Sequence, residues 1–392
     1  MRPQLSRPRY LLGATLLSAL VGVTFAFGVP ESQQGGCGGP AVEEETAVEL
    51  ASQAVRQRCS GQQRELSTDR NHCGACNHSC LGGTCKQGKC QPLALTSANQ
   101  AKFLAIDGSN AYWTSYHGTV KRVPLSGGSA VTLASGFDET EGIAVDTSYI
   151  YFTANSRYAG VAGKLYRVGL GGGTPTQLAK APFGDSTRGR IFLTGGNLYW
   201  STLPGTLYVT PTGGYVWPRT SEDAQFVVGN APQSGRTYAF NGSYFYWKDE
   251  AQGQLRSAGT NGSEAVLATG VASGGGLVVA DAYRLLFTAS SGIYWMPTSG
   301  AQAPGSVYGY LEDTFRFIGQ LALDPQNLYW AESTTSSIST GAMDGSCVIQ
   351  KKGLSGTPRV QVATVSDFPN DLVVDANAVY VAGTQSIWKI AK

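Results

Sequence analysis

Residue types that commonly carry out catalysis are sparse in this chain. It has three histidines, His72, His78 and His117, and the first two stand among closely spaced cysteines. Imidazole chemistry elsewhere would therefore depend on His117 alone. There is no Gly-rich phosphate loop, no nucleophile elbow and no zinc-protease HExxH motif. These absences favour a binding protein, and the remaining route to catalysis is a pair of acids that the fold brings together.

Cysteines are the second set of reactive residues. Six of them form one dense segment: Cys59, Cys73, Cys76, Cys80, Cys85 and Cys90. In an exported protein this even set predicts a disulfide framework, because so short a segment buries too little surface to fold alone. Three bridges allow fifteen pairings, and the spacing does not choose among them. With His72 and His78 close by, a zinc site is the alternative, since zinc prefers cysteine and histidine ligands.

Charged and aromatic residues form a third set, in polar segments between predicted strands. The candidates are Asp138, Glu139, Glu141, Asp185, Arg188, Arg190, Arg236, Arg316, Tyr116, His117 and Tyr158. If the fold brings these segments to one face, their mixture of acids, arginines and aromatic rings suits a polar ligand, a glycan or a protein. Ordinary solvated loops are the alternative. No cofactor is expected, and a site built from carboxylates would take calcium rather than zinc.

The elements that must position these residues are repeats. The segment 104–114, LAIDGSNAYWT, recurs six more times, with Tyr112, Tyr151, Tyr199, Tyr246, Leu286, Tyr329 and Tyr380 in register. The copies are 39 to 51 residues apart by subtraction of these positions, which is near the length of a propeller blade. Asp or Asn usually stands five residues before the register position and is expected to cap the turn amides with its side chain.

Each copy predicts four antiparallel strands, and radially stacked four-stranded units make a β-propeller. The seventh copy lacks a fourth strand, and the segment 92–97 before the first copy resembles one. We therefore predict an all-β, seven-bladed propeller over 91–392, closed by 92–97 in its last blade, with six blades as the alternative. In the sixth copy the expected third strand begins at Ser336.

The predicted chain path divides the loops between two faces. Loops that lead into the first strand of each blade, and those between strands two and three, lie on what we call the top face. Turns between strands three and four lie on the bottom face, where we expect Cys347. The closing strand starts at the bottom, just after Cys90, so a bridge between the two leftover cysteines, Cys37 and Cys347, is predicted. A free buried thiol is the alternative.

The amino-terminal region resembles an export signal. Arg2, Arg7 and Arg9 precede an uncharged run from Tyr10 to Val29. We predict a signal peptide at 1–28, a linker with a short helix at 29–58 and the cysteine segment at 59–90. The protein is thus expected outside the cytoplasm, and a membrane is involved only if the apolar run remains as an anchor. The formal net charge of +2 argues against a nucleic-acid partner.

The repeats resemble the YWTD-type propellers of low-density-lipoprotein-receptor relatives and their bacterial cousins. The resemblance rests on Tyr112-Trp113-Thr114, Tyr199-Trp200-Ser201, Tyr246-Trp247-Lys248-Asp249, Tyr329-Trp330-Ala331-Glu332 and Met343-Asp344-Gly345-Ser346. The fourth position is acidic only at Asp249 and Glu332, and receptor members typically have six blades. The cysteine segment looks like modules of secreted myxobacterial proteins, and the combination resembles exported, uncharacterised bacterial propellers.

We expect a secreted or surface-associated propeller that binds a protein or a glycan. The alternative is an extracellular lyase or hydrolase acting in the central channel.

Overall fold

The computed structural model describes residues 56–181, 185–202, 206–211, 225–228, 238–271, 277–289, 292–309, 316–334 and 347–392. The predicted signal peptide and most of the predicted linker lie outside these residues. The short helix expected at 29–58 can be compared only at its end, where Arg56–Cys59 is strand β1 and not helix. Residues 50–392 belong to one compact unit.

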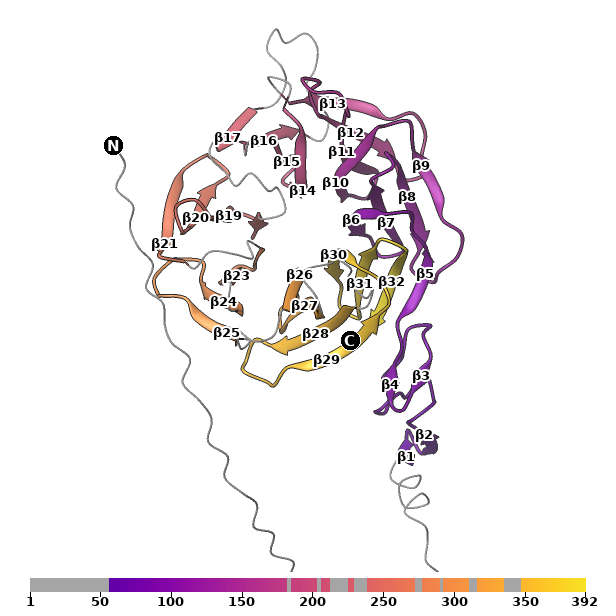
Figure 1. The fold of residues 1–392 in the computed structure, drawn as a ribbon. Helices are drawn as coiled ribbons and strands as arrows, with labels where there is room; N and C mark the ends of the chain where they lie inside the picture. Colours follow the sequence, from indigo (N-terminus) through magenta and orange to yellow (C-terminus); the bar gives the residue numbers. More distant parts are fainter. Residues whose placement is uncertain are drawn as a thin grey trace, which may run out of the picture. The chain divides into compact units, whose positions relative to one another are not determined.

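Seven four-stranded antiparallel sheets form the blades of a ring (Figure 1). Blade one contains β6 (Ala101–Ile106), β7 (Asn110–Ser115), β8 (Val120–Pro124) and β9 (Val131–Ala134). Blade two contains β10 (Glu139–Val145), β11 (Tyr149–Asn155), β12 (Lys164–Gly169) and β13 (Thr176–Lys180). Blade three contains β14 (Thr187–Thr194), β15 (Asn197–Thr202), β16 (Thr206–Pro211) and β17 (Gln225–Val228). The seven sheets confirm the prediction of seven blades over the alternative of six.

The other blades follow the same order. Blade four contains β18 (Ala239–Phe240), β19 (Tyr244–Asp249), β20 (Gln254–Gly259) and β21 (Glu264–Thr269). Blade five contains β22 (Val278–Ala280), β23 (Arg284–Ala289), β24 (Gly292–Pro297) and β25 (Gly305–Gly309). Blade six contains β26 (Arg316–Leu323), β27 (Asn327–Thr334), β28 (Cys347–Gly353) and β29 (Val360–Val365). Blade seven contains β30 (Pro369–Val374), β31 (Ala378–Gly383), β32 (Ser386–Ala391) and β5 (Leu93–Ser97).

Strand β5 closes the ring. It precedes the first blade in the sequence but pairs with β32 of the last blade, with Ser97 opposite Ser386 and Leu93 opposite Lys389. Leu95 of this strand is 2% exposed and packs in a core cluster that includes residues of blades seven and one. The two ends of the propeller are therefore held in one sheet.

The repeated turn acids and tyrosines form a shared hydrogen-bond unit. Asp107 Oδ1 accepts the amides of Ser109 and Asn110, and its Oδ2 accepts the hydroxyl of Tyr112 at 2.7 Å. The same hydroxyl-to-carboxylate bond recurs in the pairs Tyr151–Asp146, Tyr329–Asp324 and Tyr380–Asp375. The predicted turn capping is thus confirmed at these aspartates. The carboxylate has a second role, because its bond to the tyrosine hydroxyl fixes the ring that each of these four blades packs against the next blade.

One predicted strand was wrong. In blade six the third strand is Cys347–Gly353, which pairs with β27 on one side and β29 on the other, and it does not begin at Ser336. Cys347 lies opposite Val365, the last residue of β29, so it stands at the top end of its strand rather than in a bottom turn. The geometric reason given for a bridge from Cys347 to the cysteine segment therefore fails.

The cysteine segment consists of two small hairpins. They are β1 (Arg56–Cys59) with β2 (Gln62–Glu65), and β3 (Cys85–Lys86) with β4 (Lys89–Cys90). Disulfides join Cys59 to Cys76, Cys73 to Cys85 and Cys80 to Cys90. The predicted framework of three bridges is confirmed, and its pairing is now defined. Cys73, Cys80 and Cys90 share a small core with Ala391 of β32, and His78 Nε2 lies 2.9 Å from the Lys392 carbonyl oxygen.

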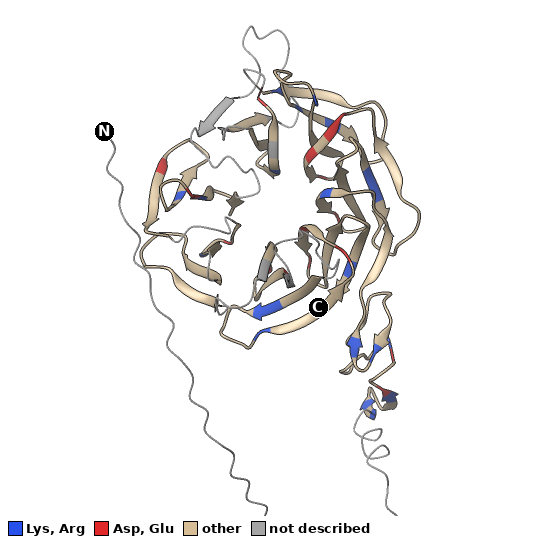
Figure 2. Ribbon diagram, in the orientation of Figure 1, with Lys and Arg blue, Asp and Glu red and all other residues tan. Residues whose placement is uncertain are grey.

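Charged side chains are scattered over the ring and the cysteine segment, with basic and acidic residues in many blades (Figure 2). The described residues contain no helix with the length and apolar character that a bilayer-spanning segment needs.

Candidate functional site

A buried ion cluster lies at the top of blades one and two. Lys102 is 2% exposed, and its Nζ donates to Glu139 Oε1 at 2.6 Å and to Glu141 Oε1. The same ammonium lies 4.4 Å from the centre of the Tyr116 ring. A buried charge is costly unless it is paired, and here two carboxylates and an aromatic face compensate it. The cluster therefore fixes Tyr116 and Glu139 at the top face.

Bulges in the first strands explain how these side chains meet. The pairing of β6 with β7 shifts between Ala101 and Leu104, so Lys102 falls in the bulge. The pairing of β10 with β11 shifts between Thr140 and Ile143, so Glu141 also falls in a bulge. An extra residue bends a strand and redirects its side chain. Lys102 and Glu141 thereby meet across the boundary between two blades.

A second ion pair crosses between blades that are distant in the sequence. Arg190 of β14 donates from Nη2 to Asp371 Oδ1 of β30, and to the Leu372 carbonyl oxygen at 3.3 Å. Asp371 is 1% exposed, and its Oδ2 also accepts the Leu104 amide at 2.9 Å. One carboxylate thus connects the first strands of blades one, three and seven. Arg190 also falls in a bulge, because the β14–β15 pairing shifts between Arg188 and Phe192.

The central channel contains a cavity of about 260 Å³. Arg190 and Gln320 contribute polar groups to its lining, and Phe192, Tyr238 and Phe240 contribute aromatic rings. Tyr238 is 4% exposed, and its hydroxyl has no hydrogen-bond partner among the described residues. Burial raises the pKa of this hydroxyl well above its usual value, so it is a neutral donor. Most of the lining residues are of apolar types, and the one cation among them, Arg190, is already bound to Asp371.

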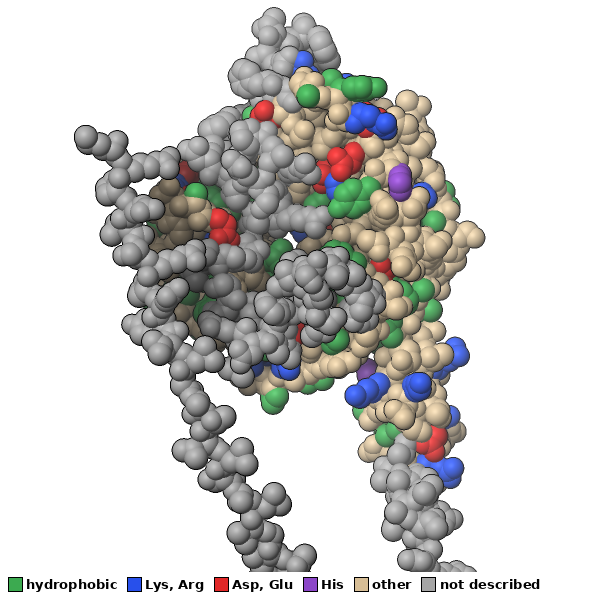
Figure 3. Space-filling model, viewed as in Figure 1, with side chains coloured by type: hydrophobic (Ala, Val, Ile, Leu, Met, Phe, Trp, Pro, Cys, Tyr) green, Lys and Arg blue, Asp and Glu red, His purple; other side chains and the backbone are tan. Residues whose placement is uncertain are grey.

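An exposed tyrosine follows a surface salt bridge on blade two. Asp138 accepts the Arg157 amide at 3.1 Å, the Ser156 hydroxyl at 3.2 Å and the Arg157 Nε at 3.0 Å. The backbone hydrogen bond from Arg157 is the main reason that the pKa of Asp138 is lowered. The next residue, Tyr158, is 70% exposed. In Figure 3, hydrophobic side chains lie beside acidic and basic ones over this part of the ring.

The remaining predicted site residues divide into three groups. Asp185 is half-buried, and its carbonyl oxygen accepts the Gly163 amide at 2.8 Å, a local structural contact. His117 is exposed next to Tyr116 and makes a backbone hydrogen bond to Ser115 Oγ. The side chains of Arg188 and Arg316, and all of Arg236, lie outside the described residues. The structure thus brings together Tyr116, Glu139 and Glu141, and places Arg190 separately in the channel.

Lys102 was missing from the predicted site, and the pairing of Asp371 with Arg190 was not predicted. Lys102 meets its acids 37 and 39 positions away, and Asp371 meets Arg190 at a separation of 181 positions. The sequence contains one signal for Lys102, since a lysine stands where an apolar residue is expected at the start of a first strand.

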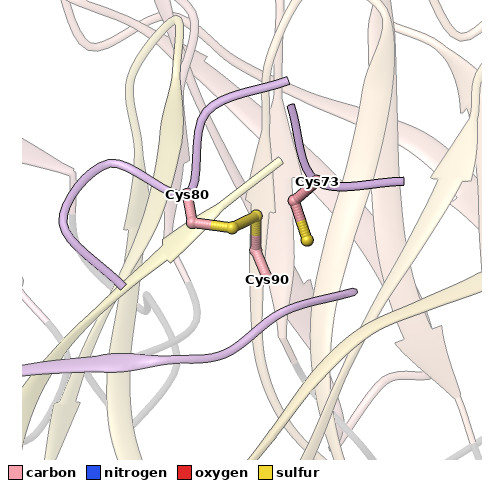
Figure 4. A group of neighbouring side chains, drawn as sticks. All are labelled: Cys73, Cys80 and Cys90. Atoms are coloured by element: carbon pink, nitrogen blue, oxygen red, sulfur yellow. A yellow bond between two sulfur atoms is a disulfide. The ribbon is translucent and has the colours of Figure 1, made fainter. Parts of the chain in front are cut away.

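The cysteine cluster does not offer a metal site. The sulfur atoms of Cys73, Cys80 and Cys90 lie within 4.8 Å of one another (Figure 4). All three are in disulfides, however, and zinc requires free thiolates. The zinc alternative is therefore wrong for these residues. Within the described ranges, no other group of three or more carboxylates, histidines and cysteines lies close enough to hold an ion.

Cys347 is a free thiol. It is 2% exposed, and its Sγ donates to the Glu332 carbonyl oxygen at 3.2 Å. Burial raises the pKa of this thiol to about 12. This state agrees with the alternative of a buried thiol. Cys37, the predicted partner, lies outside the described residues, so the bridge stays a prediction.

Fold and site together define a seven-bladed β-propeller with a charged, aromatic top face. No protein-family model matches the chain, and no curated protein matches it. Among solved structures it is similar to YCF48 bound to a D1 peptide, with TM-score 0.59, 13% identity, and coverage of 77% of this chain and 96% of that one. It is also similar to the WD40 propeller domain of Doa1, with TM-score 0.52, 11% identity, and coverage of 77% and 97%. A third similar structure is the computationally designed protein Ika8, with TM-score 0.51, 13% identity, and coverage of 76% and 98%. At these identities the likeness shows the propeller fold alone.

Proposed function

We propose that this propeller is an exported protein-binding module that uses the top face of blades one and two. The observation that carries the proposal is the Lys102–Glu139–Glu141 cluster, which holds Tyr116 in place next to a salt-bridged loop that presents Tyr158. Tyrosines are enriched among residues that dominate binding energy, and rigid presentation lowers the entropy lost on binding. YCF48, a propeller of similar fold, has been solved with a bound peptide, which supports a protein ligand over a glycan.

The proposal also includes export from the cytoplasm and membership of a propeller family. Three disulfides in the segment 59–90 are supporting evidence for an oxidising compartment, together with the signal-like amino terminus. The tyrosine-tryptophan pairs with turn acids support membership of the YWTD type. The enzyme alternative has less support, because three of the described carboxylates, Glu139, Glu141 and Asp371, are already bound to Lys102 and Arg190.

Photo-crosslinking from defined positions tests the proposed face. A photoreactive phenylalanine replaces Tyr158 in one variant and Tyr283 in a matched control. Tyr283 is 80% exposed and belongs to the turn between the first two strands of blade five, on the bottom face. We expect a discrete protein adduct from position 158 and none from position 283, using the extracellular fraction of the native host. An adduct formed only from position 283 would refute the proposed face.

A further inference from the structure

The boundary between blades five and six differs from the other six. In six blades the register tyrosine packs into a core shared with the next blade: Tyr112, Tyr151, Tyr199, Tyr246, Tyr329 and Tyr380. In blade five the equivalent residue is Leu286, which packs into the core shared with blade six. Leucine lacks the ring and the hydroxyl of tyrosine. Asp281, the turn acid of this blade, accepts Arg284 Nε at 2.8 Å instead of a tyrosine hydroxyl.

A cavity of about 330 Å³ lies at this boundary. Leu286, Trp295 and Val307 line it from blade five, and Leu354 lines it from blade six. Its volume is at the lower end of the range typical of small-molecule sites. The cavity thus lies at the boundary where leucine stands in place of the repeated tyrosine.

The walls of this cavity are fixed by contacts outside it. On blade six, the Gly353 amide donates to Thr357 Oγ1 at 3.0 Å, and the Leu354 amide donates to the Gln326 carbonyl oxygen at 2.8 Å. On blade five, the Trp295 indole lies against Gly305, where a Cβ would be 3.0 Å from the indole Nε1. Trp295 remains 37% exposed. A preformed site of this kind loses little entropy when a ligand binds.

The charge at the cavity is positive. Arg284 and Lys352 both line it. Arg284 is paired with Asp281 at 2.7 Å and also donates to the Pro325 carbonyl oxygen at 3.1 Å. Lys352 makes a long hydrogen bond of 3.4 Å from Nζ to the Thr357 carbonyl oxygen. Lys352 therefore supplies a cation that an anionic ligand can reach next to an aromatic and aliphatic cavity.

We propose that the boundary between blades five and six is a binding site for a small aromatic anion, namely a phenyl or phenol ring that carries a carboxylate. The ring packs against Trp295 and Val307, next to the position where the other blades carry a tyrosine. The carboxylate pairs with Lys352. This site is independent of the proposed top face.

The probe for this site is 4-hydroxyphenylacetate, titrated into the full-length protein and followed by calorimetry and ligand-observed NMR. We expect saturable binding with a Kd of the order of 1 mM, because so small a ligand has few atoms in contact. The variant Leu286→Tyr restores the repeated side chain and fills the cavity. It should weaken binding by about tenfold or more while the melting temperature stays equal or rises.

A second variant tests the role of charge without altering the cavity. Lys352→Gln should weaken binding of 4-hydroxyphenylacetate severalfold and leave binding of the neutral 4-ethylphenol unchanged. Lys351→Gln is the matched control, since neighbouring residues of a strand point to opposite faces. No saturable binding to the wild-type protein, or unchanged binding in Leu286→Tyr, would overturn the proposal. Equal affinity for the charged and neutral probes would overturn its anionic part.

Discussion

At the scale of single residues, hydrogen bonds to turn carboxylates connect protonation to stability. Asp324 accepts the Tyr329 hydroxyl at 2.9 Å and Lys392 Nζ at 2.6 Å. Burial alone would raise the pKa of Asp324, but hydrogen bonds from Lys392, the Gln326 amide and Tyr329 lower it to about 2. A carboxylate with a lowered folded-state pKa stabilises the protein above its unfolded-state pKa. That contribution disappears as the pH falls from about 4 towards 2.

The substitution Asp324→Asn tests this linkage. We expect it to lower the free energy of unfolding near pH 7 by about 1–2 kcal/mol. The difference from the wild-type protein should shrink as the pH falls from about 4 to 2, since Asp324 is protonated first in the unfolded state and then increasingly in the folded state. Urea unfolding measured across this range gives both quantities. A difference that is constant from pH 7 to pH 2 would contradict the assigned role.

Cys347 gives a second prediction at this scale. A buried thiol whose pKa is raised to about 12 is protonated and shielded, so it should resist iodoacetamide in the folded protein at pH 8. In denaturant without reductant, Cys347 should be alkylated completely, because it forms no disulfide. Peptide mapping by mass spectrometry reads both states, and the six bridged cysteines serve as internal controls. Alkylation of Cys347 only after reduction would show that it is bridged after all.

At this scale, the sequence predicted contacts between residues that are close in the chain, but not contacts between residues that are far apart in it. Asp107 and Tyr112 are five positions apart, so the repeat itself exposes their relation. Lys102 and Asp371 contact their partners because strands bulge and the ring closes. The sequence repeat predicts neither feature. Tyr116 was predicted as a site residue, but the lysine that holds it was not.

At the scale of elements, closure by β5 is the step on which the ring depends. Leu95→Ala should lower the free energy of unfolding by about 2–5 kcal/mol, because Leu95 is 2% exposed in the core near both chain ends of the propeller. Thr96→Ala on the same strand is the matched control, with an expected change below about 1 kcal/mol. Equal effects of the two substitutions in urea unfolding would argue against closure by this strand.

Prediction at this scale succeeded where a strand had glycine turns and alternating residues, and failed in blade six. The segment from Ser336 has the small and polar residues of a strand edge, whereas the true third strand, CVIQKKG, has no repeated motif. The segment between strands two and three is longer in blade six than the prediction assumed. The spacing of the other copies therefore does not predict where its third strand begins. The short β18 (Ala239–Phe240) and β22 (Val278–Ala280) show that the same repeat yields strands of different lengths.

At the scale of the whole molecule, the cysteine segment and the propeller meet where the chain closes. The segment leads directly into β5, and its core of Cys73, Cys80 and Cys90 includes Ala391 of β32. Three disulfides stabilise a part that has almost no apolar core of its own. Among the described residues, the cysteine segment contacts the propeller at Ala391 and Lys392, where the chain closes.

The most direct test of the proposed function is a binding measurement. It compares the affinity of the partner captured at position 158 for the wild-type protein and for a set of surface variants. The double variant Tyr116→Ala, Tyr158→Ala should weaken binding by about 100-fold, since central aromatic residues commonly contribute 2 kcal/mol or more. Tyr283→Ala, at the opposite face, should leave the Kd within about twofold of the wild-type value. Calorimetry with the purified partner measures all three proteins. Unchanged affinity in the double variant, or a loss confined to Tyr283→Ala, would contradict recognition by the top face.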